Sequence, residues 1–365
     1  MSKKKKKKGM NTNAKWGVAF LVEFAVFITM VVGYGVYWAN NKMDNINYAA
    51  DVDFGKIEVN EGAEESQKGY TTIALFGIDA RSNTAMGEGN RTDTIMIASI
   101  NNDTKEIKIA SVYRDSLLQI RDGSNVTSKI NAAYAFGGPE LALSTLNANL
   151  DLNIDEFVTV NFLALTNAID ELGGITIHVE SNELPVLNAS IEEQIGITGI
   201  YSDGVFTTGD ILLNGTQATA YARIRSTDQG DITRTERQRD VIAKMVAKAK
   251  SSDFSTIEGI IDEVFPNVYT SIDKKEMISL AKSLFDYEMG DTVGFPFAYE
   301  PVSHEVKGAI LVPANLEANV IALHEFLFED VPYTPSQTVK DISAQLENET
   351  GVYEHEIELN IFKPE

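Results

Sequence analysis

The start of the chain constrains its architecture more than any other feature. Lys3 to Lys8 form an unbroken basic run, and a largely apolar segment of 23 residues follows from Trp16 to Trp38. As a helix, this segment is long enough to span a hydrocarbon core of about 30 Å. Its ends carry tryptophan and tyrosine rings, which favour the membrane interface, and Glu23 is its one ionisable residue. The pattern predicts a transmembrane helix.

The charge that flanks this helix predicts its orientation. Basic residues lie on its N-terminal side, so residues 1–15 are expected in the cytoplasm and the chain after residue 38 outside. A cleavable signal peptide is the competing interpretation. The apolar stretch is long for the hydrophobic region of such a peptide, and no clear small-x-small cleavage site follows it. The sequence therefore predicts a single-pass protein of the cell membrane with an extracytoplasmic body.

Composition limits what that body can do. The 365 residues carry a formal net charge of −22 and include no cysteine. Disulfides and thiolate metal sites are therefore excluded. Nucleic-acid binding is not expected of so acidic a body, because that affinity comes mainly from neutralising phosphates. The four histidines are scattered without metal-ligand spacing, and neither a nucleophile-elbow nor a P-loop motif is present.

Sequence patterns divide the extracytoplasmic part into three segments. Residues 39–69, rich in Asn, Asp, Glu and Gly, are predicted to be a spacer. Residues 70–330 alternate strand-like and helix-like stretches. This alternation predicts an α/β domain, with a mixed central sheet flanked by helices in an α/β/α sandwich. Residues 331–365 are expected to be an acidic C-terminal tail with one short helix or strand at most.

Arginine is distributed unevenly. All nine arginines lie between Arg81 and Arg239, and five of them fall in the seventeen residues from Arg223 to Arg239. The planar guanidinium fork binds phosphate or carboxylate through two parallel hydrogen bonds, whereas lysine acts as a point charge. On a strongly acidic chain, the clustering predicts a specific anion site. A solvated helix face that carries arginine by chance is the alternative.

Three predicted strands bring charged residues to one edge of the sheet. The strands run over 71–78, 94–100 and 106–112, and a hairpin turn over 101–104 joins the last two. If the strands run up, down and up, then Asp79, Asp93 and Arg114 emerge together. Two carboxylates at a strand edge suit a hard divalent cation such as Mg²⁺. For each carboxylate taken alone, a solvated loop position is the alternative.

A second set of anion-binding residues is predicted beyond residue 213. Residues 213–221 are helix-like, and the next residues are predicted to be extended, so that Arg223 and Arg225 point to one face.

A longer helix is then predicted to begin at Thr233, which forms a capping-box pattern with Glu236. Arg234 and Gln238 lie on its core-facing stripe and are expected to be paired structurally or to face a ligand. Arg239 lies off this stripe and is predicted to be at the surface or in an ion pair.

Seven short blocks resemble the ordered motifs of the LytR-CpsA-Psr family and cover roughly residues 70–250. The blocks are Gly77-Ile78-Asp79-Ala80-Arg81, Arg91-Thr92-Asp93-Thr94, Tyr113-Arg114-Asp115, Lys129-Ile130-Asn131-Ala132-Ala133-Tyr134, Gly173-Gly174, Tyr221-Ala222-Arg223-Ile224-Arg225 and Arg234-Thr235-Glu236-Arg237-Gln238. Tyr113 stands where the family more often has proline. Members are cell-wall phosphotransferases of mostly Gram-positive bacteria. They move a glycopolymer, such as teichoic acid or capsule, from a polyprenyl-pyrophosphate carrier to peptidoglycan.

The resemblance implies roles for individual residues. It implies Mg²⁺ binding by Asp79 and Asp93, with Mn²⁺ as an alternative ion, and an apolar tunnel for the lipid tail. It implies pyrophosphate contacts from Arg91, Arg114, Lys129, Arg223, Arg225, Arg234 and Gln238. The candidates for catalytic roles are Arg114, Asp93 and Asp115, and the sequence leaves open which group takes the proton of the attacking hydroxyl.

Two rival functions stay open at this stage. One is hydrolysis of a lipid pyrophosphate at the same site, with water as the acceptor. The other is a non-catalytic membrane regulator, a reading encouraged by the historical labelling of the family as transcription factors. The predicted topology argues against direct DNA binding, since only about fifteen residues are expected on the cytoplasmic side.

Overall fold

The computed structural model describes residues 47–78, 86–224, 231–253, 255–256, 259–260, 264–272 and 286–353. The predicted membrane helix and the basic run before it lie outside these residues. None of the described helices is both long enough and apolar enough to cross a bilayer.

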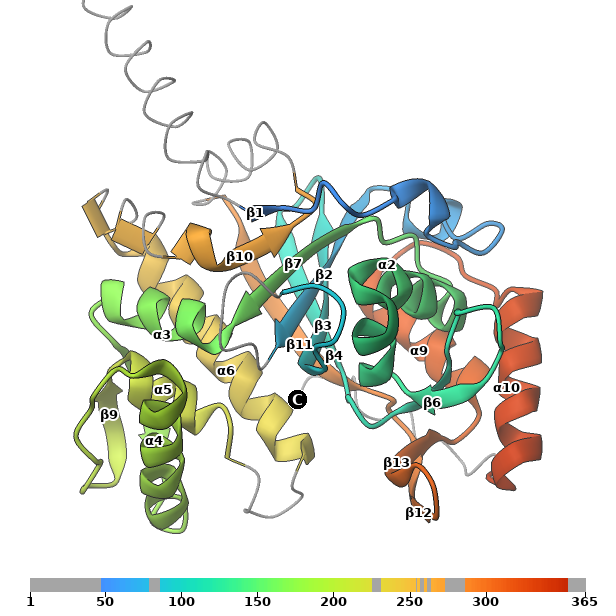
Figure 1. The fold of residues 1–365 in the computed structure, drawn as a ribbon. Coiled ribbons are helices and arrows are strands. Elements are labelled where there is room, and N and C mark those ends of the chain that lie inside the picture. The colour runs from blue at the N-terminus through green and yellow to red at the C-terminus, as the bar shows by residue number, and fades with distance from the viewer. Residues whose placement is uncertain are drawn as a thin grey trace, which may run out of the picture. The chain divides into compact units, whose positions relative to one another are not determined.

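A mixed sheet lies at the centre of the described chain (Figure 1), with seven strands in the order β1-β10-β7-β2-β3-β4-β11. The strands are β1 (Asn47–Tyr48), β2 (Tyr70–Ile78), β3 (Thr92–Asn101), β4 (Glu106–Val112), β7 (Glu156–Asn161), β10 (Val268–Thr270) and β11 (Glu288–Phe295). The β2–β3 and β3–β4 pairs are antiparallel, whereas β2–β7 and β4–β11 are parallel. The predicted mixed sheet and the up-down-up course of its first three long strands are confirmed.

One face of the sheet is covered by α2 (Asn131–Leu150), α9 (Leu316–Leu327) and α10 (Gln337–Thr350) (Figure 1). Successive side chains of a strand point to opposite faces, so β2 presents Phe76 to this layer and Leu75 to the other. The main hydrophobic cluster joins Phe76 and Ile97 of the sheet to Leu146, Leu323 and Ile342 of the three helices.

The other face is covered by a second helical layer, so the predicted helix-sheet-helix arrangement is confirmed (Figure 1). Its elements are α3 (Phe162–Glu171), α4 (Leu184–Thr198), α5 (Gly215–Tyr221), α6 (Asp231–Lys250) and the hairpin of β8 (Ile175–Val179) with β9 (Gly209–Leu213). Asn161 caps α3 by accepting a hydrogen bond from the Ala164 amide (2.9 Å). Gly173 and Gly174 end that helix in left-handed conformations, with φ of 74° and 85°.

Two further two-stranded sheets lie outside the central sheet. They are β5 (Leu117–Gln119) with β6 (Thr127–Lys129), and β12 (Tyr299–His304) with β13 (Gly308–Pro313).

The packed body extends beyond both boundaries expected from the sequence. Within the segment 39–69, expected to be a spacer, β1 pairs with β10, and Asn60 Nδ2 donates to Ala148 O of α2 (2.9 Å). Within the segment 331–365, expected to be a tail, α10 buries Val339, Ile342 and Leu346 in the main cluster. These residues recur at helical spacing, but their surroundings are polar in sequence. Their partners on α2 and α9 decide their burial.

Two helix starts also differ from the prediction. Leu213 is the last residue of β9, and α5 begins at Gly215, with a capping box between Asn214 and Gln217. Thr233 lies inside α6, which begins at Asp231, so the capping box predicted at Thr233 is wrong. Thr233 and Glu236 match that pattern by spacing alone, and spacing does not identify where the chain turns into the helix.

Candidate functional site

The edge where β3 begins and β4 ends carries the centre of the candidate site. Arg114 Nη1 donates to Asp93 Oδ1 at 2.5 Å, as the predicted convergence requires. The neighbouring strand β2 ends at the same edge, because Ile78 pairs with Thr92. Asp79, the other predicted metal ligand, lies outside the described residues.

Arg114 belongs to a chain of four alternating charges. Its Nε lies 3.5 Å from Asp115 Oδ2, and Lys129 Nζ lies 2.7 Å from Asp115 Oδ1. The side chains of Asp93, Arg114, Asp115 and Lys129 are between 18 and 23% exposed. Solvent therefore screens these charges less than it screens surface ion pairs, and their orientations are fixed by one another. The structure brings together four of the predicted site residues.

Local backbone contacts explain how Lys129 and Arg114 come to lie side by side. Lys129 pairs with Leu117 in the short β5–β6 ladder, and the Asn131 amide donates to Arg114 O (3.2 Å) where α2 starts. The Tyr113 amide donates to Phe295 O (2.9 Å), which extends the link between β4 and β11. A proline at position 113 could not make this bond.

Arg234 approaches Asp93 from the other helical layer. It lies in the first turns of α6, is 1% exposed, and donates from Nη2 to Asp93 O (2.9 Å). Asp93 thus accepts a hydrogen bond from Arg114 at its carboxylate and another from Arg234 at its backbone carbonyl. Hydrogen bonds that involve a charged group are about twice as strong as neutral ones. The predicted inward orientation of Arg234 is confirmed.

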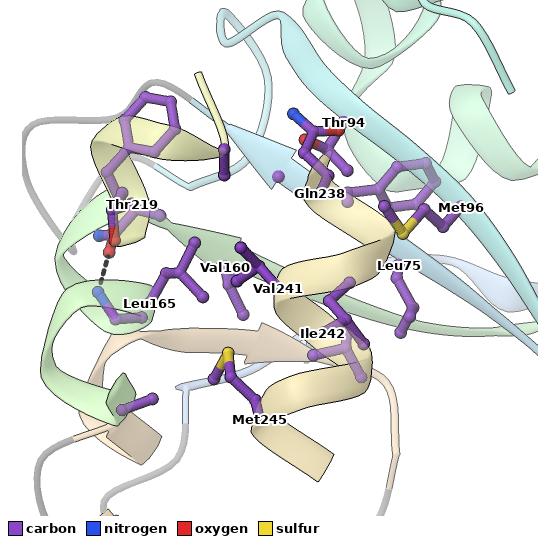
Figure 2. A pocket seen from close by; sticks show the side chains of 18 of the residues that line it. Leu75, Thr94, Met96, Val160, Leu165, Thr219, Gln238, Val241, Ile242 and Met245 are labelled. Carbon is purple, nitrogen blue, oxygen red and sulfur yellow. Dashed lines mark hydrogen bonds between the residues drawn. The ribbon is translucent and has the colours of Figure 1, made fainter. Parts of the chain in front are cut away.

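An apolar cavity of about 310 Å³ lies between the sheet and the second helical layer (Figure 2). Its lining comes from β2, β3, β7, α3, α5 and α6, and includes Leu75, Met96, Val160, Leu165, Val241, Ile242 and Met245. The resemblance implied such a tunnel, but the lining strands and helices cannot be assembled from sequence periodicity. The sequence patterns did not point to the β7 residues of this lining. Asn161, the last of them, could have been noticed, because an asparagine between a strand and a helix is a recognisable cap signal.

The polar side chains Gln238 and Thr94 lie together at one end of this cavity (Figure 2). Gln238 Oε1 is buried and has no hydrogen-bond partner among the described residues. Thr94 packs against Gly77, where a Cβ atom would stand only 2.9 Å from Thr94 Cβ. Gly77 is therefore required for close packing of the two strands beside the site. Gln238 and Arg234 are one helical turn apart on α6. This end of the cavity therefore lies next to Arg234 and its partner Asp93.

Arg223 also lines the cavity, but its backbone differs from the prediction. It lies in a turn after α5, where its amide donates to Ala220 O (3.1 Å), and not in an extended segment. Its guanidinium donates to Gln194 Oε1 (2.9 Å) and to Glu193 Oε1 (3.2 Å) and stands 4.4 Å from the Phe162 ring centroid. These contacts orient Arg223 in the lining of the mainly apolar cavity.

The surface position predicted for Arg239 is wrong. Arg239 is 9% exposed, and the hydrogen bond that it donates to Thr235 Oγ1 is long at 3.5 Å. Burial lowers the pKa of its guanidinium. A helical stripe shows which residues face one neighbour, and it gives no information about a second neighbour on another side of the helix. Here α6 also contacts β4 and β11.

Two predicted anion-binding residues remain, and only one of them lies among the described residues. Arg91 is exposed, directly before β3. Arg225 lies outside the described residues.

Of the two predicted metal ligands, Asp79 and Asp93, the structure describes Asp93 alone. The part of the chain that the structure describes has no group of three or more metal-binding side chains. Asp93 nevertheless offers a partly exposed carboxylate, the type of oxygen donor that Mg²⁺ prefers. A site completed by Asp79 is compatible with this donor chemistry.

The chain is similar to several known proteins. The polyisoprenyl-teichoic acid–peptidoglycan teichoic acid transferase TagU of Enterococcus faecalis is 30% identical over 297 residues, which are 78% of this chain and 91% of that protein. The Biofilm regulatory protein A of Streptococcus mutans is 31% identical over 270 residues, or 68% of this chain and 61% of that protein. A crystal structure of a protein from Streptococcus agalactiae superposes with a TM-score of 0.62 at 26% identity, covering 76% of this chain and 92% of that one.

The model of the LytR_cpsA_psr family matches residues 33–295, which include Arg114, Lys129, Arg234 and the helices around the cavity. The chain belongs to the LytR-CpsA-Psr family.

Proposed function

We propose that this chain is a membrane-anchored, extracytoplasmic phosphotransferase. Its donor is a glycopolymer, such as teichoic acid or capsule, linked to a polyprenyl pyrophosphate, and its acceptor is peptidoglycan. The N-terminal segment 16–38 is the proposed anchor, and the body lies outside the cell membrane.

The observation that carries the proposal is the junction of two unlike environments. An apolar cavity of about 310 Å³ ends at Gln238, one helical turn from the buried Arg234. A long apolar tail with an anionic head has this same division, with the tail in the cavity and the phosphates beside Arg114 and Arg234. A wholly water-soluble phosphate ester would leave the cavity without a ligand group to bury.

The reaction requires little covalent chemistry from the protein. A sugar hydroxyl of the acceptor forms a bond to the phosphorus that carries the polymer, and the bond from that phosphorus to the lipid phosphate oxygen breaks. The polyprenyl phosphate leaves, and the hydroxyl proton passes to a base, for which Asp93 and Asp115 are the candidates. Phosphoryl transfer is accelerated mainly by positioning and by neutralising charge on the transferred group. Arg114, Arg234 and Lys129 supply such charge.

A divalent cation fits this site. We propose that Asp79 and Asp93 hold Mg²⁺ or Mn²⁺, which when bound neutralises charge on the phosphate oxygens. Arg114 orients the Asp93 carboxylate through the hydrogen bond between them.

A transfer assay tests the proposal. The full-length chain in detergent is mixed with a radiolabelled lipid-linked glycopolymer and peptidoglycan, and the label is then located. Label on peptidoglycan is the expected result, and it should depend on Mg²⁺. Label in free polymer would instead indicate a lipid pyrophosphate hydrolase. Intact donor after incubation would favour a non-catalytic regulator of the cell envelope.

A further inference from the structure

A buried ion pair between Arg237 and Glu183 links α6, the start of α4 and the turn after α5. Arg237 is 6% exposed, and its Nη2 and Nε donate to Glu183 Oε1 at 2.8 and 3.0 Å. Glu183 immediately precedes α4, and its other carboxylate oxygen accepts the Glu180 amide (2.9 Å). Both oxygens of this carboxylate are therefore engaged, which holds the start of α4 against α6.

The same arginine also holds the turn after α5. Its Nη1 donates to Ile224 O (3.3 Å), and its guanidinium lies 5.6 Å from the centroid of the Tyr221 ring. Tyr221 and Ile224 are the two ends of that turn, and the Ile224 amide donates back to Tyr221 O (3.3 Å). Arg237 thus contacts the turn at its first and last residues.

Arg223 lies within this turn, and its side chain depends on the other element that the ion pair holds. The partners of its guanidinium, Gln194 and Glu193, belong to α4. The Glu183–Arg237 pair therefore sets both the backbone from which Arg223 projects and the helix that orients its guanidinium.

We propose that Glu183 and Arg237 form a positioning clamp that places Arg223 at the rim of the apolar cavity to bind the anionic head of a polyprenyl diphosphate. This inference rests on the proposed function, because it assumes that the cavity takes a lipid with a diphosphate head. Arg237 acts through Arg223 and is not among the described residues that line the cavity.

The experiment compares two ligands that differ only in the head. The affinities of the full-length chain in detergent for geranylgeranyl diphosphate and for geranylgeraniol are measured by calorimetry, and their ratio isolates the contribution of the phosphates. In Arg237→Met, this ratio should fall about tenfold, the equivalent of one charge-assisted hydrogen bond, while the affinity for the alcohol stays unchanged. Arg237→Lys keeps the charge but cannot reach Glu183 and Ile224 together, so it should not restore the ratio.

Hydrogen exchange supplies a readout that needs no ligand. The amides of Arg223 and Ile224 should exchange faster in Arg237→Met than in the natural chain, while amides of the central sheet keep their protection. Arg121→Gln is the matched control, since Arg121 is also partly buried and ion-paired, with Glu58, and its hydrogen bonds go to residues outside the turn. This variant should change neither the ratio nor the exchange of the turn.

Each outcome decides between the clamp and an ordinary structural ion pair. Equal losses of affinity for both ligands, or an unchanged ratio, would overturn the proposal. If Arg237→Met does not fold, Glu183→Gln carries the test, because it keeps the shape and one oxygen acceptor while removing the charge. If the natural chain shows no preference for the diphosphate, the proposed function is what has failed, and exchange at residues 223 and 224 still decides whether the clamp orders the turn.

Discussion

Asp93 shows how single residues of the site are preoriented. Arg114 binds its carboxylate and Arg234 its carbonyl, and these arginines come from two different blocks of the family motifs. Side chains that are already held lose less conformational entropy when a ligand binds. The four alternating charges from Asp93 to Lys129 should therefore bind a phosphate group with little rearrangement.

A substitution at Asp93 tests the metal role at this scale. Asp93→Asn keeps the shape and the oxygen that accepts from Arg114 but removes the negative charge. Transfer in the presence of Mg²⁺ should fall by at least about a hundredfold, because even outer-shell partners of metal ligands are worth tenfold to a hundredfold. Initial rates are measured across Mg²⁺ concentrations and in chelator. Asp103→Asn, at an exposed turn, is the control, and a natural chain that is equally active in chelator would contradict the metal site.

At the level of elements, the site depends on the close approach of β2 and β3. β2 can lie against Thr94 of β3 only because residue 77 has no Cβ atom. Gly196 of α4 is exposed, and a methyl group added there would have no described atom within 4 Å, so only the flexibility of this glycine matters.

These two glycines should respond to alanine in opposite directions. Gly77→Ala should lower the free energy of unfolding by about 1–3 kcal/mol, because overpacking forces the strands apart. Gly196→Ala should raise it by about 0.5–1 kcal/mol, since alanine is the better helix former. Scanning calorimetry of both variants measures the difference. A neutral Gly77→Ala would show that Thr94 moves away at little cost.

The docking of α9 depends on a buried histidine. His324 Nε2 donates to Leu150 O at the end of α2 (2.8 Å), and the ring stacks on Tyr333 with centroids 3.6 Å apart. Burial lowers the pKa of His324 to about 4, so the ring is neutral in the folded chain at neutral pH.

This histidine predicts a loss of stability in mild acid. The unfolded chain takes up a proton near pH 6.5, whereas the folded chain does so only near pH 4, so stability is full above pH 6.5 and falls between these values. The loss should reach roughly 3 kcal/mol at pH 4. The measurement is urea unfolding between pH 7.5 and pH 4.5. His324→Gln should flatten this part of the profile, and His304→Gln, at an exposed position, should not; identical profiles for all three chains would refute the assignment.

Across the whole molecule, acidic residues outnumber basic ones. The chain carries −22 overall, yet Arg114, Arg234 and Lys129 gather around two aspartates beside an apolar cavity. An acidic surface repels free anions, so the proposed phosphate ligand would gain from being tethered to an apolar tail. Charged residues beside an apolar cavity are compatible with the proposed lipid-linked donor.

The topology of the molecule can be tested in cells. A protease added to intact, wall-stripped cells should degrade the body and leave only the anchor, because basic residues precede the segment 16–38. Immunoblotting against an N-terminal tag and against the body follows both parts, and lysed cells serve as the control for cleavage. A body that survives in intact cells would invert the proposed orientation and remove access to peptidoglycan.

Local patterns in the sequence were enough to predict β2, β3 and β4 and the meeting of Asp93 with Arg114. The predicted strand 106–112 coincides with β4, because the turn residues 101–104 mark where it can begin. The order of three hairpin-connected strands then brought their ends to one edge. The class of ligand that we propose follows from arginine chemistry and from the family motifs.

Only the tertiary structure decided which arginines are buried, what they bind and where the body ends. Arg237 pairs with Glu183 across 54 residues, Arg239 is covered where α6 meets β4 and β11, and β1 and α10 complete the core. Periodicity reports the direction of a side chain relative to its own helix or strand. The environment in that direction comes from residues far away in the chain, which is the physical reason why the lining of the cavity and the positioning clamp could not be predicted from the sequence.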